Sequence, residues 1–250
     1  VWIMKFGSVT TGIIADGLVF NMDAANRASY VPNATTAFNT IDLSNSGSLE
    51  NDVGFLQPPI SSSCWNFDGV DDWINCGEIP PLFKYFPIGT AKDNPWSASM
   101  WVKGSASGGF FEIPYIQSNS LNAFSFGFVF NGSYLYFGGK YAQIKMKETG
   151  TTDYSITNWN HIVMTFDGVD HTALSSYTLY VGGVSIVMEL ISGNLTDFRT
   201  ENISIGVAGS DGLPSYWDGD ISCCQLYDRP LSSTEVLHNY NALKGRFGLT

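Results

Sequence analysis

Residues 65–77 contain two apolar arms, with the heaviest apolar side chains for their length in the chain, on either side of a polar turn, and this pattern predicts a β-hairpin. The segment reads WNFDGVDDWINCG, with Trp65 and Phe67 on one arm and Trp73 at the start of the other. The residues between the arms form turns readily, because glycine adopts a positive φ freely and aspartate tolerates one. We therefore expect two paired strands around which the rest of the chain packs.

Cysteines flank this predicted hairpin and occur as an adjacent pair near the C-terminus. A three-residue loop would place Cys64 opposite Cys76 and allow a cross-strand disulfide. A four-residue loop would break that register, and buried free cysteines are common, so both alternatives stay open. Neighbours on a strand point to opposite faces, so Cys223 and Cys224 are not expected to share a metal site.

Short apolar runs separated by turn residues recur along the rest of the chain. The motif FDGVD occurs again at residues 166–170, but the sequences around the two copies do not match. The repeat therefore indicates the same local turn used twice and not a tandem duplication. A second hairpin is predicted over residues 124–137, across an Asn-Gly turn. The other expected strands are 17–23, 97–103, 110–117, 140–148, 161–167, 177–181, 184–190, 203–207 and 221–227. This series predicts an all-β, two-sheet antiparallel sandwich.

Three segments lack strand periodicity. Residues 1–14 form an N-terminal arm that we expect to add an edge strand or an assembly contact. Residues 24–53 form a long polar connection, and loops of that length usually have a task or structure of their own. Residues 78–96 contain several prolines and aromatic residues, which predicts a loop over one end of the sandwich.

One helix is predicted near the C-terminus. Ser232 and Glu235 match a capping box, and Val236, Leu237, Tyr240 and Leu243 give an apolar helical face before Gly245. We expect this short helix to pack on an edge or end of the sandwich, within a domain that covers residues 15–250.

The composition narrows the expected partners. The formal net charge is −11, and charged residues make up only 14% of the chain. An acidic surface repels phosphate backbones and anionic lipid, so nucleic acid is not an expected partner. The chain contains no apolar run of the length that a membrane span requires, and no signal peptide is recognised.

The order of motifs resembles the laminin G-like branch of the concanavalin A-like lectin/glucanase family. The resemblance rests on FDGVDDWINCG, SASMWVKG, NWNHIVMTFDG, YTLYVGG and the closing WDGDISCCQLYDRPLSSTEVLHNYNALKGRFG. It implies a jelly-roll sandwich. The opening GLVFNMDAANRASY and the closing YNALKGRFGL resemble structural proteins of tailed-bacteriophage virions.

The carboxylate pattern of the glucanases that share this fold is missing. They carry E-x-D-x-x-E on one strand, whereas the nearest acid here, Glu112, lacks a partner. A sialidase-type S-x-D-x-G-x-x-W box is not met, and His161, His171 and His238 have no spacing that suggests a site. We therefore expect no enzymatic activity.

Two acidic groups are candidates for binding calcium, and four aromatic residues are candidates for binding a sugar. The resemblance implies that calcium, if present, lies at the sandwich rim, where Asp211, Asp218 and Asp220 are the densest acidic group and Asp71 with Asp72 is another. The candidates for stacking on a sugar ring are Trp96, Tyr115, Tyr216 and Trp217, although such residues more often close a core.

The first functional hypothesis is a non-enzymatic virion structural protein of a tailed bacteriophage. It would lie on the particle surface, as a capsid decoration, fibre or tail-associated component, as a homo-oligomer among other virion proteins and in contact with host glycans. The alternative is an extracellular carbohydrate-binding lectin module, with or without calcium. A glycan-active enzyme with unrecognised acids is a third, weaker hypothesis.

Overall fold

The ten-residue strand β19 (Asp218–Tyr227) lies in the middle of the larger sheet of the computed structural model. The structure describes residues 12–59, 61–77, 95–104, 110–112, 127–131, 134–139, 142–146, 157–170, 173–192, 203–210 and 213–250. In this part of the chain, the larger sheet has eight strands in the order β14-β13-β12-β7-β19-β5-β4, with β1 also paired to β19. The other seven strands are β1 (Leu18–Asp23), β4 (Gly54–Leu56), β5 (Cys64–Asp68), β7 (Trp96–Gly104), β12 (Asn160–Phe166), β13 (Tyr177–Val181) and β14 (Val184–Ile186).

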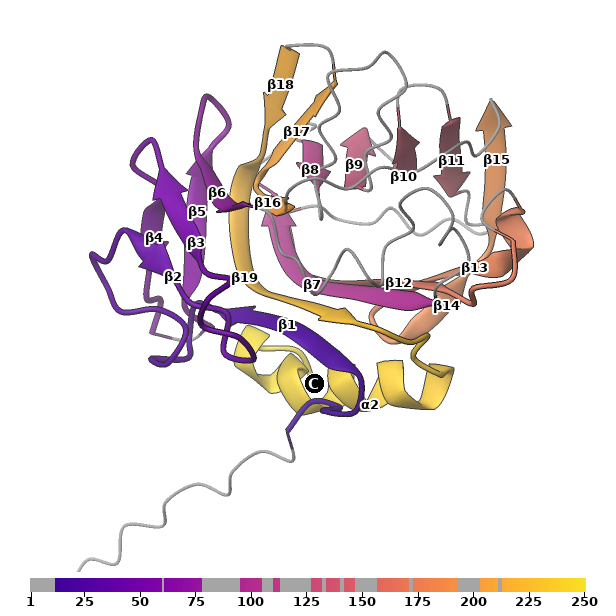
Figure 1. The fold of residues 1–250 in the computed structure, drawn as a ribbon, viewed down its shortest axis with the longest axis horizontal. Coiled ribbons are helices and arrows are strands. Elements are labelled where there is room, and N and C mark those ends of the chain that lie inside the picture. The colour runs from indigo at the N-terminus through magenta and orange to yellow at the C-terminus, as the bar shows by residue number, and fades with distance from the viewer. Residues whose placement is uncertain are drawn as a thin grey trace, which may run out of the picture.

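The second layer consists of three antiparallel groups of strands within the described residues: β16-β6-β3-β2, β15-β11-β10-β9-β8 and β17-β18. Figure 1 shows the helical C-terminal segment against the opposite side of the larger sheet. The strands are β2 (Thr36–Ala37), β3 (Gly47–Glu50), β6 (Trp73–Gly77), β8 (Phe110–Glu112), β9 (Gly127–Asn131), β10 (Tyr134–Gly139), β11 (Ala142–Met146), β15 (Met188–Ser192), β16 (Ile203–Ile205), β17 (Val207–Ser210) and β18 (Leu213–Tyr216). The expected two-sheet antiparallel jelly-roll architecture is confirmed.

Strand β19 is buried on both faces because it separates the core from the C-terminal segment. Cys224 and Leu226 belong to the central core, whereas Cys223 packs with residues of the C-terminal segment. The two adjacent cysteines therefore face opposite sides, as predicted from strand geometry. All four cysteines are buried free thiols, including Cys64 and Cys76, for which a disulfide had stayed an open alternative.

The predicted hairpin over residues 65–77 is wrong in its pairing. Both arms form at the expected positions, but β5 pairs with β19 and β4, whereas β6 pairs with β16 and β3. Trp65 and Phe67 on β5 lie in the same core as Ile74 and Cys76 on β6. The arms thus face each other across the core, and the turn between them carries the chain from one sheet to the other.

The second predicted hairpin is confirmed, since β9 pairs antiparallel with β10 and Asn131 lies opposite Tyr134. The long connection over residues 24–53 is more ordered than its composition predicts. It contains β2 and β3, and it contributes the buried side chains of Tyr30 and Ala37 to the core.

Two predicted segments lie largely outside the described residues. The aromatic loop over residues 78–96 is described only at its last two positions, and the N-terminal arm only from Gly12. Among the helices of the described part, none has the length and apolar character that crossing a membrane requires.

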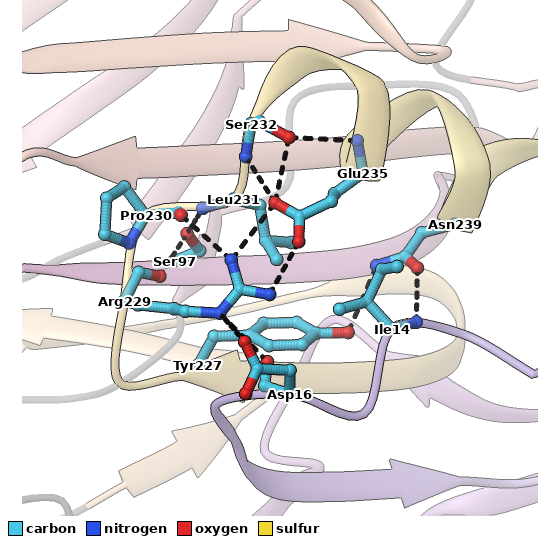
Figure 2. A network of polar contacts seen from close by, with 10 residues as sticks. All are labelled: Ile14, Asp16, Ser97, Tyr227, Arg229, Pro230, Leu231, Ser232, Glu235 and Asn239. Carbon is cyan, nitrogen blue, oxygen red and sulfur yellow. Dashed lines mark hydrogen bonds and ion pairs between the residues drawn. The ribbon is translucent and has the colours of Figure 1, made fainter.

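The predicted C-terminal helix is confirmed as α2 (Ser233–Leu243), which η2 (Lys244–Phe247) follows. The Ser232 hydroxyl accepts from the Glu235 amide, and the Glu235 carboxylate accepts from the Ser232 amide at 2.8 Å. Arg229 donates to the same carboxylate and also pairs with Asp16 (Figure 2). This network fixes the start of the helix to the chain segment before β1.

The Glu235→Gln variant is expected to lose about 1–2 kcal/mol of its free energy of unfolding at neutral pH. The hydrogen bond from Arg229 lowers the pKa of Glu235 to about 2, and bonds from Ser232 add to this. The carboxylate is about one-quarter exposed, so solvent screens part of the effect. Glutamine retains one oxygen for the capping box, but its NH2 group cannot accept a hydrogen bond, so the change removes the charge and one of the two bonds from Arg229.

The lowered pKa of Glu235 determines how this stabilisation changes with pH. The stabilisation is present above the ordinary glutamate pKa and is lost as pH falls toward about 2. Urea unfolding of both proteins across this range is the measurement. A difference in stability that does not shrink on acidification would contradict this assignment.

Candidate functional site

A pocket of about 530 Å³ opens between two parts of the long connection and β4. Two segments contribute its walls, residues 30–35 and residues 49–57. The lining residues are Tyr30, Pro32, Asn33, Ala34, Thr35, Leu49, Asp52, Val53, Gly54, Phe55 and Gln57. The pocket is thus built by the segment for which the sequence offered no regular pattern.

The aromatic part of the pocket is fixed in place by packing. The Tyr30 ring centroid lies 4.9 Å from that of Phe55 and 5.8 Å from that of the core residue Trp65. The Tyr30 hydroxyl donates to the Ala34 carbonyl oxygen at 3.0 Å. Phe55 is only half-buried, so an apolar ring surface remains next to the opening.

Polar side chains surround this aromatic surface. Asn33, Thr35, Asp52 and Gln57 are exposed and line the pocket. Asn33 and Asp52 both have a φ of 68°, in the left-handed region that asparagine and aspartate tolerate better than most residues. Residues held in such conformations occur often at binding sites.

An acidic turn lies beside the pocket, between β5 and β6. Asp68, Asp71 and Asp72 each place a carboxylate oxygen within 4.8 Å of the others. The Asn51 side chain donates to the Asp71 carbonyl oxygen at 2.8 Å, which ties the pocket segment to this turn. The sequence had marked Asp71 and Asp72 as a second acidic pair, and the structure adds Asp68 to them.

Two of the three residues in the densest acidic group of the sequence, Asp218 and Asp220, belong to the described part of the chain and lie at the start of β19. The Asp220 carboxylate accepts from Asn66 at 2.8 Å and from Lys103 at 3.3 Å, so it is engaged within the larger sheet. Asp218 is half-buried at the start of β19, and Asp211 lies outside the described residues.

The three predicted aromatic residues that the structure describes, Trp96, Tyr216 and Trp217, do not line the pocket. Trp96 and Trp217 are core residues with 2% and 0% exposure, so neither presents a face to a ligand. Tyr216 is half-buried at the end of β18, and Tyr115 lies outside the described residues. The pocket aromatics Tyr30 and Phe55 were missed. The length of the polar connection over residues 24–53 was the signal that pointed to the segment of Tyr30, and Phe55 lies just after it on β4.

The histidines in the described residues have structural contacts. His161 is 1% exposed, its Nε2 lies 3.1 Å from the Ser99 hydroxyl, and burial lowers its pKa to about 3. Ser99 is equally buried, so this serine–histidine pair is closed to a substrate. His238 contacts the Gly12 carbonyl oxygen, and His171 lies outside the described residues.

Several solved structures share this fold. Trypanosoma rangeli sialidase in complex with sialic acid superposes with a TM-score of 0.57 at 14% identity, over 94% of this chain and 34% of that chain. Domain 4 of AbnA, a GH43 extracellular arabinanase from Geobacillus stearothermophilus, in complex with arabinotriose gives 0.54 at 15% identity, over 90% and 98%. The binding domain of botulinum neurotoxin DC in complex with rat synaptotagmin II gives 0.55 at 14% identity, over 91% and 52%.

At these identities the structural matches show the fold alone, and the chain spans about a third of the sialidase. A comparison with curated protein sequences gives no match. A family model described as concanavalin A-like lectin/glucanases superfamily matches residues 84–237. Since this match covers more than half of the 250 residues, the chain belongs to the concanavalin A-like lectin/glucanases superfamily.

Proposed function

We propose that this chain is a non-enzymatic carbohydrate-binding domain and that the pocket between residues 30–35 and 49–57 holds the sugar. The observation that carries the proposal is an open pocket in which a fixed aromatic surface adjoins exposed amide and carboxylate groups. A sugar presents an apolar C–H face and a ring of hydroxyls, so it is recognised by an aromatic surface together with a few fixed polar groups.

The family relationship supports a sugar as the ligand class. Two of the structural relatives were solved with sialic acid and arabinotriose bound. These ligands belong to those proteins, and the fold alone does not carry a function from one member to another. The proposal therefore rests on the pocket, and the relatives only make a glycan the natural first choice.

The pocket lining supports binding without catalysis. Glycoside hydrolysis ordinarily needs two carboxyl groups on either side of the scissile bond. Asp52 is the one carboxylate among the residues that line the pocket in the described part of the chain. A single carboxylate accepts hydrogen bonds from sugar hydroxyls, but it does not supply an acid and a base or nucleophile together.

The test is a glycan array followed by affinity measurements on the sugar that binds best. Asn33→Gly and Asp52→Gly remove pocket side chains, while glycine adopts their positive φ without strain. Each change is expected to weaken binding about tenfold or more, because buried sugar hydroxyls lose a partner.

Val31→Ala is the control. Val31 is 47% exposed and lies between the pocket residues Tyr30 and Pro32, but it does not line the pocket itself. Its replacement is expected to leave sugar affinity within about threefold of the wild type, less than the loss of one hydrogen bond. An array without any bound glycan, or pocket variants that bind as well as the wild type, would contradict the proposal.

The more specific version places this domain on the surface of a tailed-bacteriophage virion, where a homo-oligomer would present the pocket to host glycans. It is supported by the resemblance of the opening and closing segments to virion proteins. The structure joins these two segments, since Arg246 donates to both carboxylate oxygens of Asp23 at 2.8 and 2.7 Å. The virion role stays a prediction, and it also requires that the pocket bind a glycan.

A further inference from the structure

We infer that the pocket selects uncharged glycans and rejects those that carry an anionic group, such as the carboxylate of a sialic or uronic acid. This inference rests on the proposed function, because it states which class of glycan the same pocket accepts. It follows from the sign of the charges at the site. The charged groups on the described residues of the pocket and of the turn beside it are all negative.

The neutral side chains of the pocket match sugar hydroxyls. Asn33 and Gln57 are exposed there and carry amide groups, and exposed Thr35 carries a hydroxyl. Amide and hydroxyl groups together supply both donors and acceptors of hydrogen bonds, as sugar hydroxyls do. An uncharged sugar can therefore pair with these side chains without bringing a charge into the pocket.

The pocket lining has no cation to hold an anionic sugar. Proteins commonly bind carboxylate groups through arginine or lysine side chains, which form charge-assisted hydrogen bonds with them. Among the described residues that line the pocket, none is lysine, arginine or histidine. Arg27, the cation closest in sequence to the segment 30–35, is exposed but does not line the pocket. A sugar carboxylate would therefore leave water without gaining a cationic partner from the lining.

Asp52 places a negative charge in the pocket itself. Its side chain is exposed and lines the opening two residues before β4 begins. Two like charges about 4 Å apart in water repel each other enough to change an equilibrium constant about fivefold, and more where the ligand displaces water. An anionic sugar is therefore expected to bind less tightly than an uncharged one of the same shape.

The turn between β5 and β6 adds negative charge beside the pocket. The Asn51 side chain donates to the Asp71 carbonyl oxygen, so the residue before Asp52 contacts this turn. Burial raises the pKa of Asp72 to about 6, and the charges of Asp68, Asp71 and Asp52 contribute to the rise. Asp52 and the carboxylates of the turn thus lie within electrostatic range of one another, and all of them repel an anionic ligand.

The test compares two ligands that differ in one charge. The glycan that binds best on the array is oxidised to a uronic acid at a primary hydroxyl whose O-methyl derivative still binds. The affinity of this acid is measured beside that of its methyl ester, which has nearly the same shape and no charge. The wild type is expected to bind the ester at least about fivefold more tightly in about 0.01 M salt. Most of this preference is expected to disappear in about 1 M salt, where the Debye length falls from about 30 Å to about 3 Å.

Asp52→Asn tests the origin of the preference. Asparagine tolerates the φ of 68° and keeps a polar side chain, but the charge is lost. The ratio of ester affinity to acid affinity is expected to fall to about half or less of the wild-type value. Asp167→Asn is the matched control, because it removes the same charge from an exposed turn after β12, which β7, β19 and β5 separate from β4 in the larger sheet. It is expected to keep the wild-type ratio.

The outcomes separate this inference from the proposed function. An array without any bound glycan would overturn both. If glycans bind, three results would overturn the inference alone. They are an anionic glycan as the best ligand, equal affinities for acid and ester in low salt, and an Asp52→Asn variant with the same ratio as the wild type.

Discussion

The Gly219→Ala variant is expected to lose about 3–5 kcal/mol of its free energy of unfolding, or to fail to fold. Gly219 lies in β19, where it pairs with Phe67 of β5 on one side and Gly104 of β7 on the other. A Cβ atom here would lie 2.3 Å from the Lys103 carbonyl oxygen and 2.7 Å from the Gly104 Cα. Both atoms belong to the backbone of a paired strand, so they are not free to move away as the end of a side chain is.

The backbone conformation adds to this cost. Gly219 has a φ of 148°, which side chains of L-residues rarely adopt. Gly245→Ala is the matched control, because a Cβ there would have no atom within 4 Å and the position lies in the helical turn η2. It is expected to change stability by no more than about 1 kcal/mol, in the stabilising direction. Urea unfolding of the two variants makes the comparison, and equal stability would show that β19 is not pressed against β7 as described.

The Trp101→Ala variant is expected to lose about 3–5 kcal/mol and to release the C-terminal segment from the sheet. Trp101 is fully buried on the outer face of β7. Its ring centroid lies 4.0 Å from that of Phe247, 5.7 Å from that of Tyr240 and 5.0 Å from that of His161. One indole thus joins the larger sheet to both α2 and η2.

Hydrogen exchange distinguishes release of this segment from a general loss of stability. Amides over residues 233–247 are expected to lose protection before those of β12 and β13 in Trp101→Ala. Leu237→Ala is the control on the same helix, since Leu237 is 45% exposed, and its effect is expected to stay within about 1 kcal/mol. Undiminished protection of α2 in Trp101→Ala would contradict the role given to this stack.

Local sequence patterns predicted the positions of the strands and of the helix better than they predicted which strands pair with each other. The alternation around Trp65 and the capping box at Ser232 depend on neighbours in sequence, and both elements form where expected. The pairing of β5 and β6 depends on which sheet each arm joins, which is set by β19 and β16 more than a hundred residues away. An Asp-Gly turn fits a hairpin and a crossing between sheets equally well, so the motif alone did not decide.

The pocket could not be predicted from the sequence for a similar reason. β2 and β3 are short and largely polar, so they leave no period in the sequence. Tyr30 and Phe55 meet only because the two ends of the connection return to the same place. Conversely, Trp217 was a reasonable candidate for sugar stacking from sequence, but the sequence does not show that its ring lies in the core.

We propose that a glycan binds in the pocket between residues 30–35 and 49–57. An amide NMR titration of the full chain with the best glycan from the array would locate the binding surface. The largest shifts are expected on these two segments, including Asn33, Asp52 and Gln57. Shifts that centre on another face, such as β12 to β14, would contradict this proposal.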